Sequence, residues 1–288
     1  MKTTLSEISI SNLKDFENNP FIFREDTAFE MLMESISNLG VITPIIVRTL
    51  DDGNFEIISG HRRVEACRRL KIETIPCIVK ELIRDEATVI LVDLNLQRDE
   101  VLPSEKAYAY KMKMDALKNQ GARTDLTSRQ PVDKSDSRRT GEIIGEEAGD
   151  SERQVQRYIR LTYLLPEILK LVDEERIAFT PAVELSYIPL DLQERIYDFY
   201  TENEVTPSYS QAVRMKNYQC HGNLTIDKIN EILSEEKPNQ KEYLKIPTDR
   251  LYNLIKPWYT EKQKQEFIIK AVEHYNRYLQ RQQYRGSR

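Results

Sequence analysis

The sequence predicts an α+β protein built from two or three small domains. Three observations support this prediction. Short β-rich runs alternate with helical patterns in the first third of the chain, the middle reads as short helices alone, and a long amphipathic helix follows Thr260. A length of 288 residues suits such a division.

The first region, residues 1–117, predicts a mixed α/β unit. Apolar residues spaced as on one helix face precede Gly40, which favours a helix stop. The sequence Asp51-Asp52-Gly53 is a turn signal between two short β-rich runs. The expected elements after Gly40 are strands over Ile45–Arg48 and Phe55–Ser59, a helix over Val64–Leu70 and a strand over Ile75–Val79.

Two polar stretches divide the rest of the chain. The stretch 118–140 has almost no large aliphatic side chains and cannot bury a face, which predicts a linker or mobile loop. A second, weaker boundary is expected at 219–242. The expected domains are therefore an α/β domain at 1–117, an all-α domain at 141–218 and a small C-terminal domain at 243–288.

The C-terminal domain is expected to contain a short strand at Tyr243–Ile246 and the helix after Thr260. One face of that helix carries an apolar stripe, which predicts that residues 243–288 form a homodimer. The stripe consists of Ile268, Ala271, Val272, Tyr275 and Leu279.

Composition limits the function classes. With 40% hydrophobic and 31% charged residues, 9 Gly and 12 Pro, the chain is neither fibrous nor wholly disordered. A net charge of −5 argues against indiscriminate nucleic-acid binding but allows a local basic face. The three unpatterned cysteines support neither a disulfide framework nor a metal knuckle. No apolar run has the length of a membrane helix and the start lacks a secretory signal, so a cytoplasmic protein without membrane contact is expected.

The segment EIISGHRRVEACRRL predicts an anion site. Gly60 permits a tight turn from strand to helix, and the new helix offers unpaired backbone N–H groups. Arg62 and Arg63 add guanidinium donors suited to phosphate. The alternative is an ordinary turn with solvated arginines. The segment is neither a Walker loop nor a GxGxxG fingerprint.

The segment VDLNLQRDE offers a second set of phosphate and metal ligands. The amide oxygen of Asn95 can coordinate Mg²⁺, and Arg98 can neutralise phosphate charge. The alternative is a polar helix end.

Residues 143–161 have the pattern of a helix-turn-helix. Gly145, Gly149 and Val155 have the spacing that lets two helices cross closely, and Asp150 or Ser151 can cap the second helix. Arginine and glutamine side chains on the outward face are suited to base edges and phosphates of double-stranded DNA. The alternative is a plain helical hairpin. The expected DNA-binding residues are Ser151, Arg153, Gln154, Gln156, Arg157 and Arg160.

The order of these motifs resembles the ParB family of chromosome and plasmid partition proteins. The resemblance covers roughly residues 5–215 and begins at ENNPFIFR. It implies an N-terminal domain that binds CTP and Mg²⁺, a DNA-binding centre and a C-terminal dimerisation domain. A dimeric, CTP-dependent DNA clamp at the nucleoid or a plasmid is therefore expected.

The resemblance also assigns roles to single residues. It places the nucleotide at Gly60, His61, Arg62 and Arg63, and at Asn95 and Arg98. At the position of the family's glutamate, which is associated with hydrolysis, this sequence has Leu94. Weak or absent CTPase activity is therefore expected unless Asp93 substitutes.

Partner proteins and rival classes remain open at this point. The resemblance implies a ParA-type ATPase partner, although the N-terminus lacks the basic arm through which family members stimulate it. The alternatives are a nucleotide-independent transcription regulator and a nucleotide-using enzyme on a sulfiredoxin-like domain.

Overall fold

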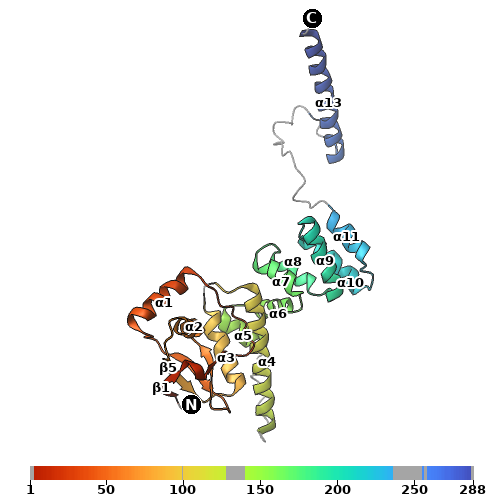
Figure 1. The fold of residues 1–288 in the computed structure, drawn as a ribbon. Helices are drawn as coiled ribbons and strands as arrows, with labels where there is room; N and C mark the ends of the chain where they lie inside the picture. The colour runs from red at the N-terminus through yellow and green to blue at the C-terminus, as the bar shows by residue number, and fades with distance from the viewer. Residues whose placement is uncertain (1–2, 99, 128–139, 236–254, 256–257, 287–288) are drawn as a thin grey trace. The chain divides into compact units, whose positions relative to one another are not determined.

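A computed structural model describes residues 3–98, 100–127, 140–235, 255 and 258–286 (Figure 1). The chain forms two compact units, residues 1–235 and 236–288. Each unit is considered by itself below.

The first unit begins with a five-stranded mixed sheet in the order β1-β5-β3-β4-β2. Strands β1/β5 and β3/β4 pair antiparallel, whereas β3/β5 and β2/β4 pair parallel. The strands are β1 Thr3–Ser9, β2 Leu13–Lys14, β3 Ile45–Thr49, β4 Phe55–Ser59 and β5 Thr74–Lys80. The predicted strands of this region are confirmed, and β1 and β2 are additional.

Helices cover both faces of this sheet. Successive strand side chains point to opposite faces, so Ile57 packs with helices α1 (Thr27–Leu39) and α2 (His61–Arg69), whereas Ile58 packs with α3 (Arg84–Leu96). Helix α1 ends where the sequence predicts, at Gly40 with φ 70°.

Helix α4, Pro103–Thr127, connects the α/β part to the helical part. Its residues contribute to three apolar cores, through Ala109 beside the sheet, Ala107 in the helical part and Tyr110 under α5 and α6. The prediction of a linker over 118–140 is wrong for residues 118–127, which are helical. A helix already nucleated by its packed first turns can extend through polar residues that bury no face of their own. Residues 128–139 lie outside the described residues.

The helical part that follows contains the predicted short helices. They are α5 Thr140–Ala148, α6 Glu152–Leu161, α7 Pro166–Asp173, α8 Phe179–Leu185, α9 Leu190–Asn203, α10 Tyr209–Cys220 and α11 Ile226–Ser234.

The second predicted linker, 219–242, is also partly wrong. Helix α11 lies inside it and buries Ile229, Ile232 and Leu233 in the same core as α7–α10. The apolar segment that forms this face is short and has acidic residues on both sides. In the sequence it therefore resembles a boundary between domains.

In the second unit, the described residues contain the predicted long helix, α13 Glu261–Gly286. Thr260 and Gln263 cap its start reciprocally, with Thr260 N donating to Gln263 Oε1 at 2.9 Å. Val272 and Tyr275 of the predicted stripe are exposed. The predicted strand at 243–246 lies outside the described residues.

Candidate functional site

The turn between β4 and α2 depends on Gly60. Its φ of 101° is left-handed, and a Cβ atom there would lie 2.5 Å from Cγ2 of Ile45. Glycine therefore lets the chain turn directly from the sheet into α2. The first unpaired backbone N–H groups of α2 belong to His61 and its neighbours, so they lie beside the side chains of His61 and Arg62. This helix end is therefore suitable for an anion.

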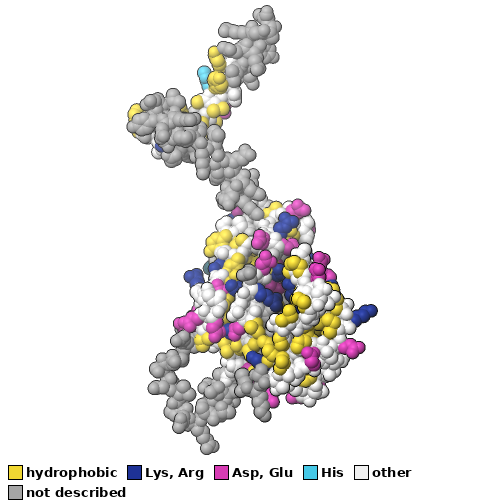
Figure 2. All heavy atoms as spheres, turned by 90° about the vertical axis from the view of Figure 1, so that its left-hand side faces the viewer, with side chains coloured by type: hydrophobic (Ala, Val, Ile, Leu, Met, Phe, Trp, Pro, Cys, Tyr) yellow, Lys and Arg dark blue, Asp and Glu magenta, His cyan; other side chains and the backbone are white. Residues whose placement is uncertain are grey.

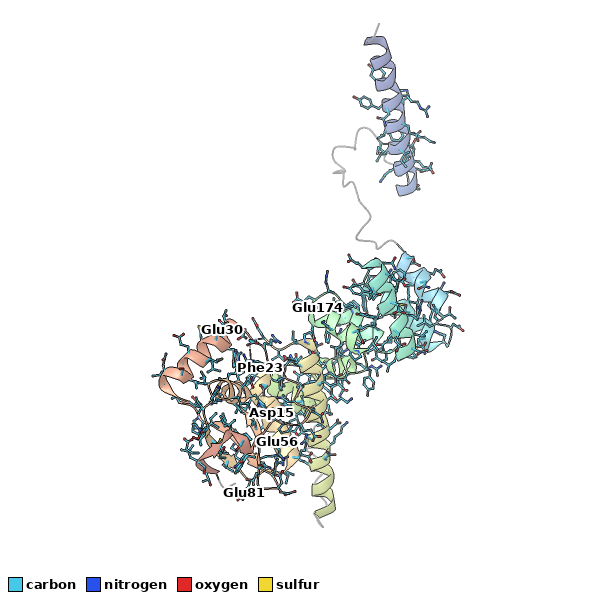
Figure 3. All side chains as sticks on the ribbon, viewed as in Figure 1. Asp15, Phe23, Glu30, Glu56, Glu81 and Glu174 are labelled. Carbon is cyan, nitrogen blue, oxygen red and sulfur yellow. The ribbon has the colours of Figure 1, made fainter. Side chains whose placement is uncertain are left out.

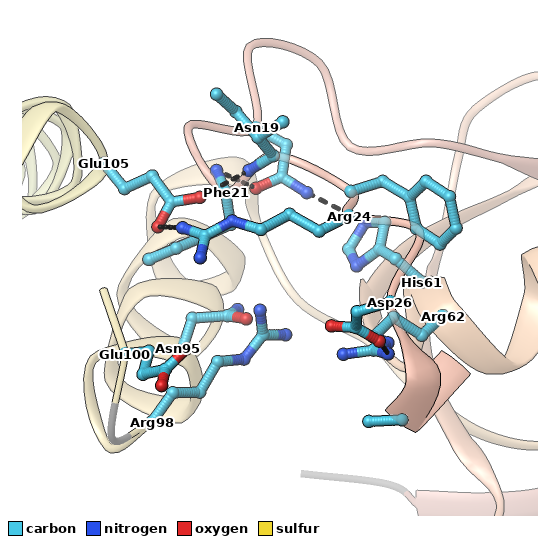
Figure 4. A pocket seen from close by; sticks show the side chains of 13 residues that line it. Asn19, Phe21, Arg24, Asp26, His61, Arg62, Asn95, Arg98, Glu100 and Glu105 are labelled. Carbon is cyan, nitrogen blue, oxygen red and sulfur yellow. Dashed lines mark hydrogen bonds and ion pairs between the residues drawn. The ribbon is translucent and has the colours of Figure 1, made fainter. Parts of the chain in front are cut away.

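A cavity of about 530 Å³ lies in front of this helix end (Figure 4). The segment before α1, the start of α2, the end of α3 and the residues leading into α4 form its walls. Its volume falls in the range of small-molecule sites. The lining residues are Asn19, Phe21, Ile22, Phe23, Arg24, Asp26, Ala28, His61, Arg62, Asn95, Arg98, Glu100 and Glu105.

Three arginines line this cavity, and two of them are ion-paired. Arg62 Nη2 lies 2.5 Å from Asp26 Oδ1, and Arg24 Nη2 lies 3.4 Å from Glu105 Oε2. Asp26 also caps α1 by accepting from Phe29 N at 2.7 Å, and this bond helps lower the pKa of its carboxyl.

Arg98 differs from the other two arginines. It forms no ion pair with another described residue, and its guanidinium lies 5.8 Å from the centre of the Phe21 ring. Partial burial and the nearby Arg62 and Arg24 lower its pKa, while Glu105 opposes the shift. Arg98 and Arg62 approach the open space from opposite sides (Figure 4). A bound anion would relieve the repulsion between these guanidinium groups.

His61 adds a neutral group to the cavity. Burial is the main cause that lowers the pKa of its imidazole, and the cations Arg98 and Arg68 act in the same direction. Its Nε2 lies 3.3 Å from Asn19 Nδ2, which fits a neutral ring that accepts this hydrogen bond.

Asn95 is almost fully buried, at 3% exposure, although it lines the cavity. Its Nδ2 donates to the Leu91 carbonyl at 2.7 Å, so its Oδ1 is the atom suited to a ligand. The adjacent Leu94 is 40% exposed. Asp93 is not among the cavity residues and pairs instead with Lys113 of α4.

The structure thus brings together His61, Arg62, Asn95 and Arg98 of the predicted nucleotide residues. Gly60 acts through the backbone. Arg63 is not among the lining residues, and its Nη1 donates to the carbonyls of Thr43 and Pro44, the latter at 2.9 Å. In this structure Arg63 holds the loop before β3.

Sequence reasoning gave no role to several cavity residues, of which Glu105 is the most connected. Its carboxylate accepts from Ile22 N at 2.9 Å and from Leu102 N at 3.0 Å, in addition to pairing with Arg24. It therefore fastens the segment before α1 to the start of α4. The signal available in the sequence was a glutamate three residues after Leu102, which is the spacing of a capping residue.

The predicted helix-turn-helix forms from α5 and α6. A Cβ atom on Gly145 would lie 2.5 Å from the Asp150 carbonyl, and Gly149 has φ 72°. Ser151 caps α6 by accepting from Gln154 N at 3.1 Å. Val155 is fully buried against α4 and α5. Each residue of the predicted pattern therefore has the structural role that its spacing implies.

Fewer of the predicted DNA-binding side chains on α6 are exposed than the sequence predicts. Arg153 and Gln156 are exposed. Arg157 instead donates to Thr180 Oγ1 at 3.1 Å, and Arg160 donates to Ser186 Oγ at 3.1 Å. These two arginines connect α6 to both ends of α8. Long cationic side chains can lie along a neighbouring helix instead of extending into solvent.

Helix α4 also fixes the helix-turn-helix through polar contacts. Asp150, in the turn, accepts from Tyr110 OH at 2.5 Å and pairs with Lys106 at 2.7 Å. Burial and this hydrogen bond raise the pKa of Tyr110 far above its usual range. Lys113 is 1% exposed and pairs with Asp93 of α3 and Glu147 of α5. The cavity and the helix-turn-helix are thus connected through one helix.

Figure 2 shows Lys and Arg side chains gathered in the middle of one face of the first unit, with hydrophobic side chains beside them. Among the described residues, no helix has the length and apolar character needed to span a membrane.

Comparison with known proteins gives consistent matches. Residues 1–95 match the sequence model of the ParB N-terminal domain. A probable chromosome-partitioning protein ParB of Vibrio cholerae is 27% identical over 212 residues, covering 74% of this chain and 66% of that protein. A nucleoid occlusion protein of Bacillus thuringiensis is 28% identical over 240 residues, covering 82% of this chain and 70% of that protein.

Solved structures of Caulobacter crescentus ParB, C-terminally truncated, are also similar. The complex with the centromeric parS site has a TM-score of 0.43 and 21% identity, covering 79% of this chain and 98% of that one. The complex with CTP-gamma-S has a TM-score of 0.31 and 26% identity, covering 67% and 99%.

Proposed function

Because the chain belongs to the ParB family, we propose that it is a site-specific DNA-binding partition protein whose N-terminal cavity binds CTP. The observation that carries the nucleotide part is the convergence of His61, Arg62 and Arg98 at the start of α2. Arg98 has no ion-pair partner among the described residues of this cavity. Such an arrangement suits a triphosphate better than a neutral ligand.

The phosphate groups are expected to bind between Arg98 and Arg62. Arg62 is already paired with Asp26, so it would share its donors between Asp26 and the ligand. Arg98 has no ion-pair partner among the described residues, so its charge is available to the ligand. The backbone N–H groups at the start of α2 and the ring of His61 complete the phosphate side. Arg63 would then act indirectly, by fixing the loop that packs against the Gly60 turn.

A Mg²⁺ ion fits this proposal through Asn95. Among the described residues, no group of three or more His, Cys, Asp and Glu side chains could hold a metal ion. The oxygen of Asn95 would supply one ligand, with phosphate oxygens and water as the others. The ion would neutralise phosphate charge. Since Leu94 carries no carboxylate and Asp93 is paired with Lys113, we expect nucleotide binding with slow or absent hydrolysis.

DNA recognition is assigned to α6. Arg153 and Gln156 are the exposed members of its outward face and are suited to guanine and adenine edges. Ser151 and Gln154 lie near its N-terminus, where phosphates bind. Arg157 and Arg160 would need to leave α8 or contact DNA with donors that remain free.

In the proposed mechanism, the second unit holds two copies together through α13, and CTP with target DNA favours a closed arrangement of the N-terminal parts. The ligand must bind the closed arrangement more tightly for this shift to occur. We expect the protein at the nucleoid or on a plasmid, with a ParA-type ATPase as the candidate partner.

Photocrosslinking of radiolabelled CTP to the full-length protein tests the proposal. The DNA would be the site recovered from genomic fragments by repeated selection with the same protein. Crosslinking should rise with this DNA, and excess CTP, but not ATP or GTP, should compete. Equal competition by CTP, ATP and GTP, or no labelling with selected DNA present, would contradict the nucleotide part. Failure to select any preferred sequence would contradict site-specific DNA binding.

A further inference from the structure

A row of cations and exposed tyrosines lies on the first unit beside α6. Cations and tyrosines alternate along the row, and each tyrosine ring contacts two cations. The side chains come from α4, α6 and α10 and from the residues that follow α6 and α8 (Figure 3). In order, the members of this cation–tyrosine row are Lys111, Tyr163, Arg160, Tyr187 and Lys216.

Both tyrosines of the row remain open to solvent. Tyr163 is 52% exposed and Tyr187 is 43% exposed. The guanidinium of Arg160 lies 4.5 Å from the centre of the Tyr163 ring and 4.1 Å from that of the Tyr187 ring. The electrostatic attraction between a cation and a ring face holds such long side chains in place. The row therefore presents cations at defined positions on the surface.

The row carries a net positive charge. Arg160 gives Nε and Nη2 to the hydroxyl and carbonyl oxygens of Ser186, which are neutral acceptors. Among the described residues, neither Lys111 nor Arg160 pairs with an acid, and Arg160 Nη1 has no acceptor. Lys216 pairs with Glu184 at 2.8 Å, but the side chain of that acid is only 18% exposed. The surface therefore suits an anionic partner.

The row continues the face of α6 that we expect to meet DNA. At roughly 100° per residue, Arg160 lies between Arg153 and Gln156 around the helix axis, about two turns after Arg153. Arg153 and Gln156 are the exposed residues assigned above to base edges. Lysine, arginine and tyrosine side chains are all donors that proteins use on DNA phosphates. The position of the row thus favours DNA over an acidic protein as the partner.

We propose that the cation–tyrosine row binds the phosphate backbone of DNA beside the bases read by α6, and so adds affinity that does not depend on sequence. This inference rests on the proposed DNA-binding function. It extends the DNA contact beyond the helix-turn-helix, to Lys111 of α4 and Lys216 of α10. Arg160 can take part through Nη1 while its other donors stay on Ser186.

The test compares two duplexes on the full-length protein without nucleotide. Fluorescence anisotropy would measure the affinity for the selected DNA and for an unrelated duplex of equal length at several salt concentrations. Lys111→Met with Lys216→Met removes two charges and keeps apolar stems, whereas Lys111→Arg with Lys216→Arg keeps the charges. Lys228→Met is the matched control, because Lys228 also lies over a tyrosine outside the row, 5.2 Å from the centre of the Tyr218 ring.

The methionine pair should weaken the binding of both duplexes by the same factor, about 3- to 30-fold at low salt. It should also reduce the slope of log affinity against log salt by about 1–2. The arginine pair and Lys228→Met should bind both duplexes as wild type does.

Unchanged affinity in the methionine pair, or a loss confined to the selected DNA, would overturn the role of the row. An equal loss in the arginine pair or in Lys228→Met would also overturn it. Equal binding of the two duplexes by wild type would contradict site-specific recognition but not the row, whereas binding of neither duplex would contradict both.

Discussion

At the turn between β4 and α2, the missing side chain of Gly60 makes room for Ile45. Gly60→Ala adds a left-handed strain of about 1–2 kcal/mol to an overpacking cost of about 1–3 kcal/mol, so it should lower the free energy of unfolding by about 2–5 kcal/mol. Gly53 provides the control. Its φ is 80°, but no atom lies within 4 Å of a Cβ there, so Gly53→Ala should show the strain alone. Urea unfolding monitored by fluorescence would measure both, and equal losses would contradict the packing argument.

Arg98 and Arg153 should separate the two binding activities. Arg98→Ala removes charged hydrogen bonds worth about 1.5–3 kcal/mol, so CTP affinity should fall about 10- to 100-fold while affinity for the selected DNA without CTP stays unchanged. Arg153→Ala should show the opposite pattern, with DNA affinity reduced by about 1–3 kcal/mol and CTP affinity retained. Titration calorimetry and fluorescence anisotropy measure the two affinities. Loss of both in either variant would show that the sites are not separable by these residues.

His61 should make the stability of the first unit depend on pH. Burial lowers the pKa of its imidazole below the ordinary value of 6.5. The unfolded chain therefore takes up a proton first as the pH falls, and stability is lost below about pH 6.5 until the folded pKa is reached. Between pH 7.5 and 5.5, wild type should lose more stability in urea unfolding than His61→Asn does. A parallel decrease in both proteins would mean that other groups dominate.

At the scale of elements, removing the buried ammonium of Lys113 should cost less stability than removing its two acidic partners. Asp93 and Glu147 are 37% and 54% exposed, so they can be solvated when Lys113 is replaced by methionine, and stability should change by no more than about 1–2 kcal/mol. Asp93→Asn with Glu147→Gln leaves the ammonium buried without a charge partner and should cost about 3–5 kcal/mol. Adding Lys113→Met to that double variant should restore most of the loss. Thermal unfolding of the three variants measures these changes in stability. If the stability losses of the single and double variants simply add in the triple variant, the prediction is refuted.

The sequence predicted elements best where local spacing and local packing agree. Helix α1, strands β3 to β5 and the α5–α6 pair follow from apolar spacing and from Gly40, Gly60, Gly145 and Gly149. Strand β1 was missed because it is stabilised by pairing with β5, which lies some 70 residues further along the chain. The end of α4 and all of α11 were read as linkers, because their stability comes from cores assembled elsewhere.

The candidate site was predictable to a similar degree. His61, Arg62, Asn95 and Arg98 stand in recognisable segments, and the structure brings them into one cavity. The pairing of Arg157 and Arg160 with α8 could not be predicted, because it depends on where distant helices lie. A short motif limits which side chains are available but does not specify their tertiary partners.

At the scale of the whole molecule, we expect the second unit to mediate oligomerisation. Val272 and Tyr275 of α13 are exposed within that unit and form part of an apolar face. A chain ending at Glu235 should therefore be monomeric without DNA, whereas the full-length protein should be dimeric. Light scattering at several concentrations measures this. A dimer of the shortened chain would place the interface in the first unit.

Helix α4 contributes side chains to three cores at once, which limits where this chain can be joined to a related protein in a hybrid. The family match ends at residue 95, before Arg98 and before α4 begins. The segment that the domain model covers is therefore shorter than the segment that folds and carries the cavity. A swap joined near residue 95 would divide the cavity and separate α4 from the sheet it covers. A junction beyond Glu235 would transfer the cavity and the helix-turn-helix together within one compact unit.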